Sequence, residues 1–393
     1  MKKVAIKGKI SSSSRKSTGA LPDSAGIYSL SDAKKVLIFY GKEFDLVNIQ
    51  NDGSFSGRAP LGSATAIVFL TENYEFIGNL FAGGMNFLPL MGVESEYSEI
   101  DLSTLTLDGD RVIPANDPVG EEIVLTGDEI RFMQQVGSYY KSLAKNIDMN
   151  NDGTPDVLQN SMIDIYLVQN FRAGNWGLNE TDAELLPEDQ FAIIYSFFME
   201  GPVSLVSSTD NSIPENATLS GPSGNPYPDI INTGNSYSNN SYFKVNFSHG
   251  FDAQSSAFAE GEYTLHIDNK EFTFNYSNID MLDYWVLVIP RLRTNSGNQV
   301  TNIELEYQFP DGTIVDPRKL MKTGIQVSIN GTDNQQLLEI RSKESSPTDP
   351  DYNYYNITLE TPIELDRIAG IGLGYIDLFG NQGGNMWFST NDL

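Results

Sequence analysis

Apolar and polar residues alternate along this chain in short runs, each bounded by glycine, proline, asparagine or aspartate. Such runs predict β-strands joined by turns. Within the first 80 residues they include VAIKGKI, KKVLIFYG and the nearly continuous apolar run ATAIVFL, Ala64 to Leu70. FDLVNIQNDGSFSG places Asp52-Gly53 between two strand-like flanks, a pattern that predicts a hairpin turn. This region is therefore predicted to be an open β-sandwich.

One segment has the period of a helix. Thr126 and Glu129 have the spacing of a capping box, and apolar residues then recur every three or four positions: Ile130, Met133, Val136, Tyr140, Leu143, Ala144 and Ile147. Upstream, EIDLSTLTLDGDRV predicts a hairpin at Asp108-Gly109. Downstream, Pro155 is placed to begin a brief helical turn. The run MIDIYLVQNF that follows alternates like a strand, with a helical continuation as the alternative.

The chain from about Gly201 onward is predicted to be β throughout. Ten strand-like runs follow one another: PVSLVSS, YFKVNFS, GEYTLHI, KEFTFNYS, YWVLVIPRLR, VTNIELEYQF, GIQVSING, QLLEIRS, YYNITLE and IAGIGLGYIDL. That number fits one large or two ordinary sandwiches. The stretch from Thr209 to Asn240 is rich in Asn, Ser, Pro and Gly, which predicts a linker or a long surface loop.

A length of 393 residues suggests about two to four domains, each able to bury its own core. We predict a mainly β chain of several β-sandwiches, immunoglobulin-like or transthyretin-like, with a small helical element. The expected division is a sandwich over residues 1–85, a mixed α/β middle region over residues 86–200, and a β-sandwich region over residues 201–393.

The charge balance of the chain removes two classes of partner. Lys and Arg total 25 against 52 Asp and Glu, a formal net charge of -27. Nucleic acid and anionic membrane both need clustered cationic charge, so neither is expected as a partner. No stretch is long and apolar enough to predict a transmembrane helix. The chain contains no cysteine, which excludes disulfides, thiolate nucleophiles and Cys-ligated zinc.

The stretch DMNNDGTPD is the clearest candidate for chemistry. Calcium takes about six to eight oxygen ligands in a flexible shell. Alternate positions of this stretch supply such oxygens, and Gly153 sits where the chain must turn sharply. The predicted ligands carry a net charge of about minus three. They are the side chains of Asp148, Asn150, Asp152 and Asp156, with the backbone carbonyl of Thr154.

These residues form D-x-N-x-D-G-x-x-D, which resembles the calcium loops of thrombospondin type 3 repeats and the first part of EF-hand loops. An EF-hand closes its ligand shell with a bidentate Glu at position twelve, where this chain has Gln159. A structural calcium loop is therefore predicted in place of a sensor, joining the Thr126 helix to the next strand. The alternative is a solvated turn without an ion.

A second resemblance covers the first region. An early strand with Gly8, the NDGSF turn and a PLGSATAIVFL strand beginning at Pro60 resemble the carboxypeptidase-regulatory or transthyretin-like sandwich. In that family the module is usually an accessory or spacer domain, which implies architecture and not catalysis. The whole chain looks like bacterial surface lipoproteins that join such a sandwich to further β-domains. The lipid anchor of such a protein needs a cysteine ahead of the numbered chain.

Local signatures of catalysis are missing from the sequence. His249 and His266 are the two histidines, both in β-like surroundings, and no G-x-S-x-G, H-E-x-x-H or P-loop motif occurs. A carboxylate pair for hydrolysis is left open because the chain has many acids. Aromatic residues are the other candidates for binding, since rings in loop-like contexts stack on sugars or anchor in a protein partner. They are Trp176, Tyr352, Tyr354 and Tyr355; the alternative places Tyr354 and Tyr355 at the start of a strand and Trp176 in a domain junction.

These observations favour a non-catalytic, exported bacterial protein of the cell surface that binds or displays a glycan or protein partner. Calcium is scarce in cytosol and abundant outside cells, so a simple structural calcium loop indicates an extracytoplasmic location. Two alternatives remain: an extracellular glycan-active or peptide-active hydrolase, and a purely architectural component of the cell envelope.

Overall fold

The structure is a computed structural model, and it describes a defined set of residues. They are 2–11, 28–40, 43–93, 97–127, 129–130, 133, 147–159, 162–173, 190–202, 217–222, 231–235, 242–248, 259–267, 270–276, 286–309, 311–321, 323–333, 335–341, 354–378 and 382–389. Within residues 162–202 and 231–248 the description covers the course of the backbone. Among all these residues, no helix has the length and hydropathy to cross a membrane.

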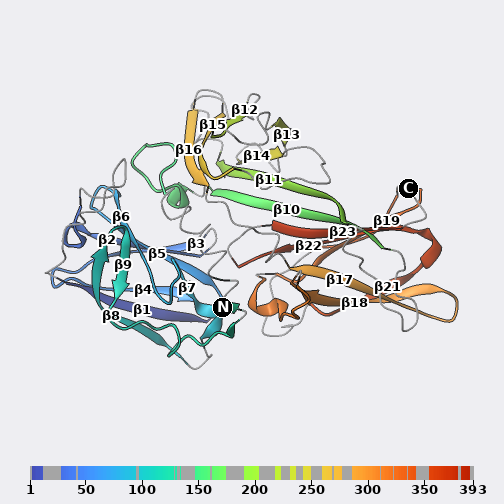
Figure 1. The fold of residues 1–393 in the computed structure, drawn as a ribbon, viewed down its shortest axis with the longest axis horizontal. Helices are drawn as coiled ribbons and strands as arrows, with labels where there is room; N and C mark the ends of the chain where they lie inside the picture. The colour runs from blue at the N-terminus through green and yellow to red at the C-terminus, as the bar shows by residue number, and fades with distance from the viewer. Residues whose placement is uncertain are drawn as a thin grey trace. The chain divides into compact units, whose positions relative to one another are not determined.

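The chain is mainly β, as the alternation predicted, and its strands form several sheets. It divides into two compact units: one comprises Met1–Ile163, Phe198–Phe247 and Phe258–Ile279, and the other comprises Asp164–Phe197, Ser248–Ala257 and Asp280–Leu393. Figure 1 shows the course of the strands within each unit.

The first unit begins with a mixed sheet in which the strand order is β3-β2-β5-β6-β9-β8-β1-β4, with β7 paired to β5. The pairs β1–β8 and β6–β9 are parallel, and the other pairs are antiparallel. The strand bounds are β1 Lys3–Ile10, β2 Lys35–Tyr40, β3 Glu43–Asn48, β4 Ser54–Pro60, β5 Ala64–Leu70, β6 Phe76–Leu80, β7 Leu88–Pro89, β8 Glu99–Asp108 and β9 Arg111–Pro114.

The predicted turn at Asp52-Gly53 forms, but the predicted hairpin is wrong. Gly53 has a φ of 83°, and its N–H donates to the carbonyl of Gln50. The flanking strands pair elsewhere: β3 with β2, and β4 with β1. The reason is packing, because β1 places Gly8 opposite Phe55 and a Cβ at Gly8 would lie 2.9 Å from the Phe55 ring. The ring thus fills the space that the glycine leaves.

One core runs through this whole sheet. It extends from Val4 to Ile123, and every residue of β5 is buried. The rings of Phe55 and Phe69 meet edge to face, with centroids 5.7 Å apart. The expected boundary at residue 85 falls inside this sheet, because β8 and β9 lie beyond it and pair with β1 and β6. The predicted hairpin at Asp108-Gly109 is confirmed, since β8 and β9 are antiparallel neighbours.

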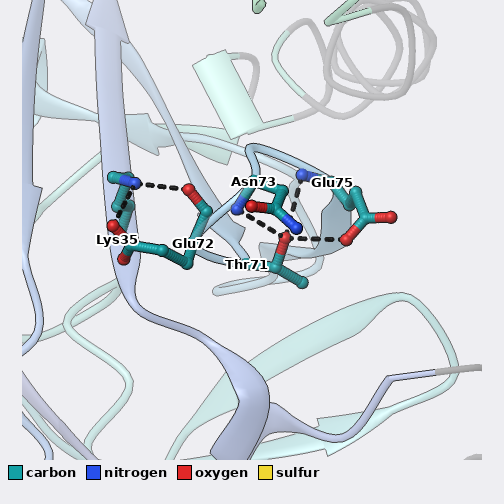
Figure 2. A network of polar contacts seen from close by, with 5 residues as sticks. All are labelled: Lys35, Thr71, Glu72, Asn73 and Glu75. Atoms are coloured by element: carbon teal, nitrogen blue, oxygen red, sulfur yellow. Dashed lines mark hydrogen bonds and ion pairs between the residues drawn. The ribbon is translucent and has the colours of Figure 1, made fainter. Parts of the chain in front are cut away.

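A turn between β5 and β6 shows how the sequence satisfies its polar groups locally (Figure 2). The Thr71 hydroxyl accepts from the N–H groups of Asn73 and Glu75 and donates to the Glu75 carboxylate. The largely buried Lys35 ammonium donates to the Glu72 carbonyl and lies 3.0 Å from the Glu72 carboxylate. These contacts use the charges within the fold, so the cluster is structural.

The helical element starts as predicted. Thr126 N–H donates to the Glu129 carboxylate at 2.8 Å, and Glu129 N–H donates to the Thr126 hydroxyl at 3.3 Å, which confirms the capping box. Ile130 N–H donates to the carbonyl of Thr126, and Met133 is buried. The rest of the predicted helix, from residue 134 to 146, lies outside the described residues.

The remaining strands of the first unit include a small antiparallel sheet of order β12-β15-β16. The stretch Thr209 to Asn240, expected to be a linker or a long loop, contains two short strands, β12 and β13. The expected boundary between residues 200 and 201 falls within β11. The strands that lie mainly in this unit are β12 Ala217–Ser220, β13 Ile231–Asn235, β14 Tyr242–Ser248, β15 Gly261–Ile267 and β16 Lys270–Tyr276. Most of β10 Met162–Ala173 and of β11 Gln190–Pro202 belongs to the second unit.

The second unit contains two groups of strands. One has the order β11-β10-β23-β22-β19-β20, with β10 and β23 parallel, and the other is β17-β18-β21. The Trp387 indole N–H donates to the Val288 carbonyl at 3.1 Å and so links β23 to β17. The bounds are β17 Leu287–Thr294, β18 Gln299–Gln308, β19 Gln326–Gly331, β20 Gln336–Ile340, β21 Asn356–Glu364, β22 Ile368–Ile376 and β23 Gln382–Ser389.

Candidate metal loop and binding surfaces

The acidic loop is anchored to the fold through Met149. The side chain of Met149 is buried, and its carbonyl accepts from the N–H of Thr273 on β16 at 2.9 Å. Its own N–H donates to Asp156 at 2.8 Å, and Asp156 N–H donates to the carbonyl of Ile147. After the loop, the helical turn predicted at Pro155 is present as a 3-10 turn over Asp156–Gln159. The loop is therefore closed on itself and attached to β16.

Two carboxylates of the loop accept several hydrogen bonds from within it. Asp148 accepts from the N–H groups of Asp152 at 3.1 Å and Gly153 at 2.8 Å. Asp152 accepts from the N–H of Thr154 at 2.9 Å and from the Gln159 side-chain amide at 2.9 Å. These amide donors compensate part of the negative charge, as the alternative without an ion requires. An ionised carboxylate has about four acceptor positions, so capacity for a cation remains.

Asp156 differs from the other two acids. It is 3% exposed, one carboxylate oxygen accepts from the Met149 N–H, and the other oxygen, Oδ1, has no hydrogen-bond partner. Burial raises the pKa of Asp156 to about 7; the Met149 N–H opposes this rise, and the nearby charges of Asp148 and Asp152 add to it. A buried carboxylate with an unpartnered oxygen is costly unless a proton or a cation compensates it.

The pKa values of the other two acids, Asp148 and Asp152, are shifted in opposite directions. Burial raises the pKa of Asp148 above its ordinary value, although the N–H groups of Gly153 and Asp152 oppose the rise. Burial also acts to raise the pKa of Asp152, but hydrogen bonds from Gln159, Thr154 and Asn150 outweigh it and lower that pKa overall. Asp152 is therefore the acid whose ionised form the loop itself stabilises most.

The donor set suits a hard cation. The five predicted ligands all offer oxygen, which fits calcium better than softer transition metals. Gln159, at the twelfth position, donates to Asp152 and supplies no carboxylate. Within the described ranges, no three acidic or histidine side chains converge closely enough to form a metal site by themselves. A bound calcium would therefore need the amide and carbonyl oxygens of the loop, and water, beside the carboxylates.

The predicted aromatic residues lie in different surroundings. Tyr354 is 2% exposed, and its hydroxyl donates to the Met321 carbonyl at 3.4 Å, so its ring belongs to the core. Tyr355 is 36% exposed, and its hydroxyl donates to the Asp316 carboxylate at 2.8 Å. Tyr352 and Trp176 lie outside the described residues. Of the predicted binding residues that the structure describes, Tyr354 and Tyr355, it is thus Tyr355 that can contact a ligand.

The histidines give no sign of a catalytic group. His266 lies on β15, and its Nδ1 is 3.2 Å from the Glu271 carboxylate on β16. The two residues face each other across the hairpin and both are substantially exposed, which is the arrangement of a surface pair. His249 falls outside the described residues.

Two grooves were not predicted from the sequence. The first, the lysine groove, has a volume of about 730 Å³ and is lined by residues of β1, β3, β4 and β8, among them Lys7, Lys9 and Phe55. The second, the edge groove, has a volume of about 800 Å³ and is lined mainly by residues of β20 and β21. Both depend on strands that belong to different parts of a sheet or to different sheets, so a local pattern does not reveal them.

No protein-family model matches this chain, and no curated protein matches it in sequence. The resemblance of the first region to the regulatory sandwich therefore stays a prediction.

Proposed function

We propose that this chain is a non-catalytic, extracytoplasmic binding or display protein whose β-domains are stabilised by a structural calcium ion in the loop Asp148–Asp156. The observation that carries the calcium assignment is the unpartnered Oδ1 of the buried Asp156. This oxygen belongs to a loop that also contains Asp148 and Asp152, whose charges act on it. A divalent cation would relieve both the repulsion and the missing partner.

The attachment of the loop supports a stabilising role. Met149 ties the loop to β16 through Thr273, and the capped helix that begins at Thr126 precedes it in the chain. An ion held by the loop would therefore fix the segment between that helix and β10. Gln159 supplies no bidentate carboxylate, which argues against the opening and closing of an EF-hand sensor.

The location and the binding role rest on the sequence. A simple calcium loop, a strongly acidic composition and the lack of cysteine together favour export from a bacterial cell. The likeness to surface lipoproteins suggests display on the outer surface, with a glycan or a protein as partner. Tyr355 is the described aromatic residue that would contact a glycan.

Thermal melting in calcium and in EDTA tests the ion. A site occupied at 100 times its dissociation constant stabilises the fold by about 2.7 kcal/mol, so the parent protein should melt clearly higher in calcium. Asp156→Asn should remove most of this difference. Asp52→Asn is the matched control, because Asp52 also accepts from a backbone N–H in a turn but does not belong to a cluster of carboxylates predicted to bind an ion. Equal melting of the parent in calcium and EDTA, with no heat on calcium titration, would contradict the assignment.

Binding of polysaccharides on a glycan array tests the partner. We expect binding that Tyr355→Ala weakens, with Tyr97→Ala as a control because Tyr97 is similarly exposed in the other unit. Hydrolysis of a bound polysaccharide would instead favour the enzyme with a carboxylate pair.

A further inference from the structure

The edge groove lies where two groups of strands end. β20 is the last strand in the order β10-β23-β22-β19-β20, and β21 is the last in β17-β18-β21, among the strands that the structure describes. The last strand of a sheet presents N–H and C=O groups along its outer edge. Residues 337–340 of β20 and the whole of β21 line the groove. The groove therefore offers a partner both the backbone N–H and C=O groups of a strand edge and a surface of side chains.

The apolar core reaches this groove without being fully covered. In the β19–β20 ladder, Leu338 faces Ile329 and Ile340 faces Val327. Ile329 and Val327 are completely buried, whereas Leu338 and Ile340 are only half-buried. The next strand added to this edge would cover both side chains. Burial of this apolar area would therefore favour binding.

The two edges differ in how far they are protected. Along β21, Val300 of β18 pairs with Ile363 and Asn302 pairs with Thr358, so residues between Thr358 and Ile363 leave the ladder. That bulged segment contains Pro362, which has no N–H to offer. Bulges and proline are common protections of a sheet edge. β20, with the sequence QLLEI, has an N–H at every position. An incoming strand should therefore pair with β20.

The charge of the groove selects among partners. Among the described residues that line it are Glu339, Glu360 and Glu364, with Arg367 as the cation. Glu339 also lies 3.5 Å from Arg341, which follows β20, so Glu360 and Glu364 supply the remaining acidic excess. A second copy of this chain carries the same net charge of -27, so repulsion disfavours it as the occupant. A segment with lysine or arginine between its apolar residues has the complementary charge and the period of a strand.

We propose that the edge groove binds an extended segment of a protein partner, with alternating apolar and basic residues, as a strand added to β20. The inference names the partner of the binding role proposed above, and it rests on that role. The five residues of β20 span about 17 Å at 3.4 Å per residue, so a segment of about five to seven residues fills the edge. Backbone hydrogen bonds would supply affinity, and the half-buried Leu338 and Ile340 would select the side chains.

Fluorescence anisotropy with three labelled heptapeptides tests this proposal on the full chain. The probe is Lys-Ile-Lys-Val-Lys-Ile-Lys; one control has the same residues with the lysines in one block, and the other replaces every lysine by glutamate. We expect the alternating basic peptide to bind at least about tenfold more tightly than either control, with affinity falling as salt rises. Equal affinity for the blocked sequence would overturn strand addition, because charge alone would then explain binding.

Protein variants locate the site. Glu339→Lys reverses an exposed charge in the groove and should weaken the alternating basic peptide about tenfold, whereas Glu262→Lys, an exposed acid on β15 in the other unit, should have little effect. Leu338→Arg should weaken binding too, and its melting temperature shows whether it folds. Unchanged peptide affinity in Glu339→Lys would overturn this inference. If the protein responds to calcium and binds glycan but binds no peptide, this inference fails while the proposed function stands. Peptide binding equal in calcium and EDTA would support it even if the calcium assignment failed.

Discussion

The lysine groove and the edge groove are similar in volume, yet they represent two ways of ending a sheet. In the first unit the strands at the two ends of the sheet order, β3 and β4, flank the lysine groove. Its apolar contribution is buried: Phe55 turns into the core against Phe69 and over Gly8. In the second unit the last strands, β20 and β21, leave Leu338 and Ile340 half-exposed.

The difference shows that groove volume alone does not identify a binding surface. At the lysine groove the exposed cations already have acidic neighbours, since Lys7 pairs with Glu99 and Lys9 lies 3.8 Å from Asp52. The fold has thus compensated both the apolar and the charged groups there. At the edge groove Glu339 likewise has a cationic neighbour, Arg341, but Glu360 and Glu364 lie beside apolar side chains that are not covered. Uncovered apolar surface with a polar rim is what a partner site offers.

The largest effect is expected from breaking the covered end of the first sheet. Phe55→Ala should lower the free energy of unfolding by about 3–5 kcal/mol, because it removes a buried ring from the seam between β1 and β4. Phe44→Ala on β3 is the control, since Phe44 is 37% exposed and should cost about 1 kcal/mol or less. Urea unfolding measures both. Equal losses would mean that Phe55 does not fill this end of the sheet.

A matched pair in the second unit sharpens the contrast. Ile329→Ala on β19 should cost about 2–5 kcal/mol because the side chain is fully buried. Leu338→Ala, its direct neighbour on β20, should cost about 1 kcal/mol because the side chain is already partly in water. If both variants lost the same stability in urea, the edge of β20 would be as well covered as the core.

Local features of the first unit were predictable from the sequence, and distant pairings were not. The capping box at Thr126 and the hairpin at Asp108-Gly109 depend on neighbours within a few residues, and both form as predicted. The strand β4 pairs with β1 because Gly8 leaves space for Phe55, more than 40 residues away. The sequence at Asp52-Gly53 therefore predicted that the chain turns there, but it did not predict which strand β4 pairs with.

The candidate loop likewise has local features that were predictable and a distant contact that was not. Its acids and the missing twelfth carboxylate were evident from spacing alone. The burial of Asp156 was not, because it depends on Met149, which is held by Thr273 on a strand more than 100 residues later. Likewise, the edge groove arises from β20 and β21, whose separate sequences show only two ordinary strands.

Two strand glycines provide a smaller test of how tightly each sheet is packed. Gly8→Ala should destabilise the first unit by about 1–3 kcal/mol, because its Cβ would lie 2.9 Å from the Phe55 ring. Gly374→Ala on β22 should be neutral or stabilise by up to about 1 kcal/mol, since its Cβ meets its nearest neighbour at 3.8 Å. Thermal melting of the two variants gives the comparison, and a stabilised Gly8→Ala would show that the Phe55 ring can yield.

The smallest expected effect on stability comes from the carboxylates Asp52 and Asp316, which accept hydrogen bonds near the first residues of β4 and β21. Asp52 precedes β4, and hydrogen bonds from Ser54 lower the pKa of Asp52 below its ordinary value. Tyr355 precedes β21 and donates to Asp316; partial burial acts to raise the pKa of Asp316, but hydrogen bonds from Arg318 and Tyr355 outweigh it and lower that pKa. Each carboxylate therefore stabilises the fold above pH 4, and this stability is lost as the pH falls through the lowered pKa.

Tyr355→Phe should accordingly cost about 0.5–1 kcal/mol at pH 7, because Asp316 is partly exposed and its hydrogen bonds are screened by solvent. The cost should shrink as the pH falls below 4, since a protonated Asp316 no longer gains from the tyrosine hydroxyl. Urea unfolding at pH 7 and pH 3 measures the two costs, with Tyr97→Phe as the control in the other unit. A cost that is the same at both pH values would mean that the Tyr355 hydroxyl acts independently of the Asp316 charge. The start of β21 would then be held by the contacts of the Tyr355 ring with Tyr307 and Arg318 and by the hydrogen bond from Leu305 N–H to the Tyr355 carbonyl.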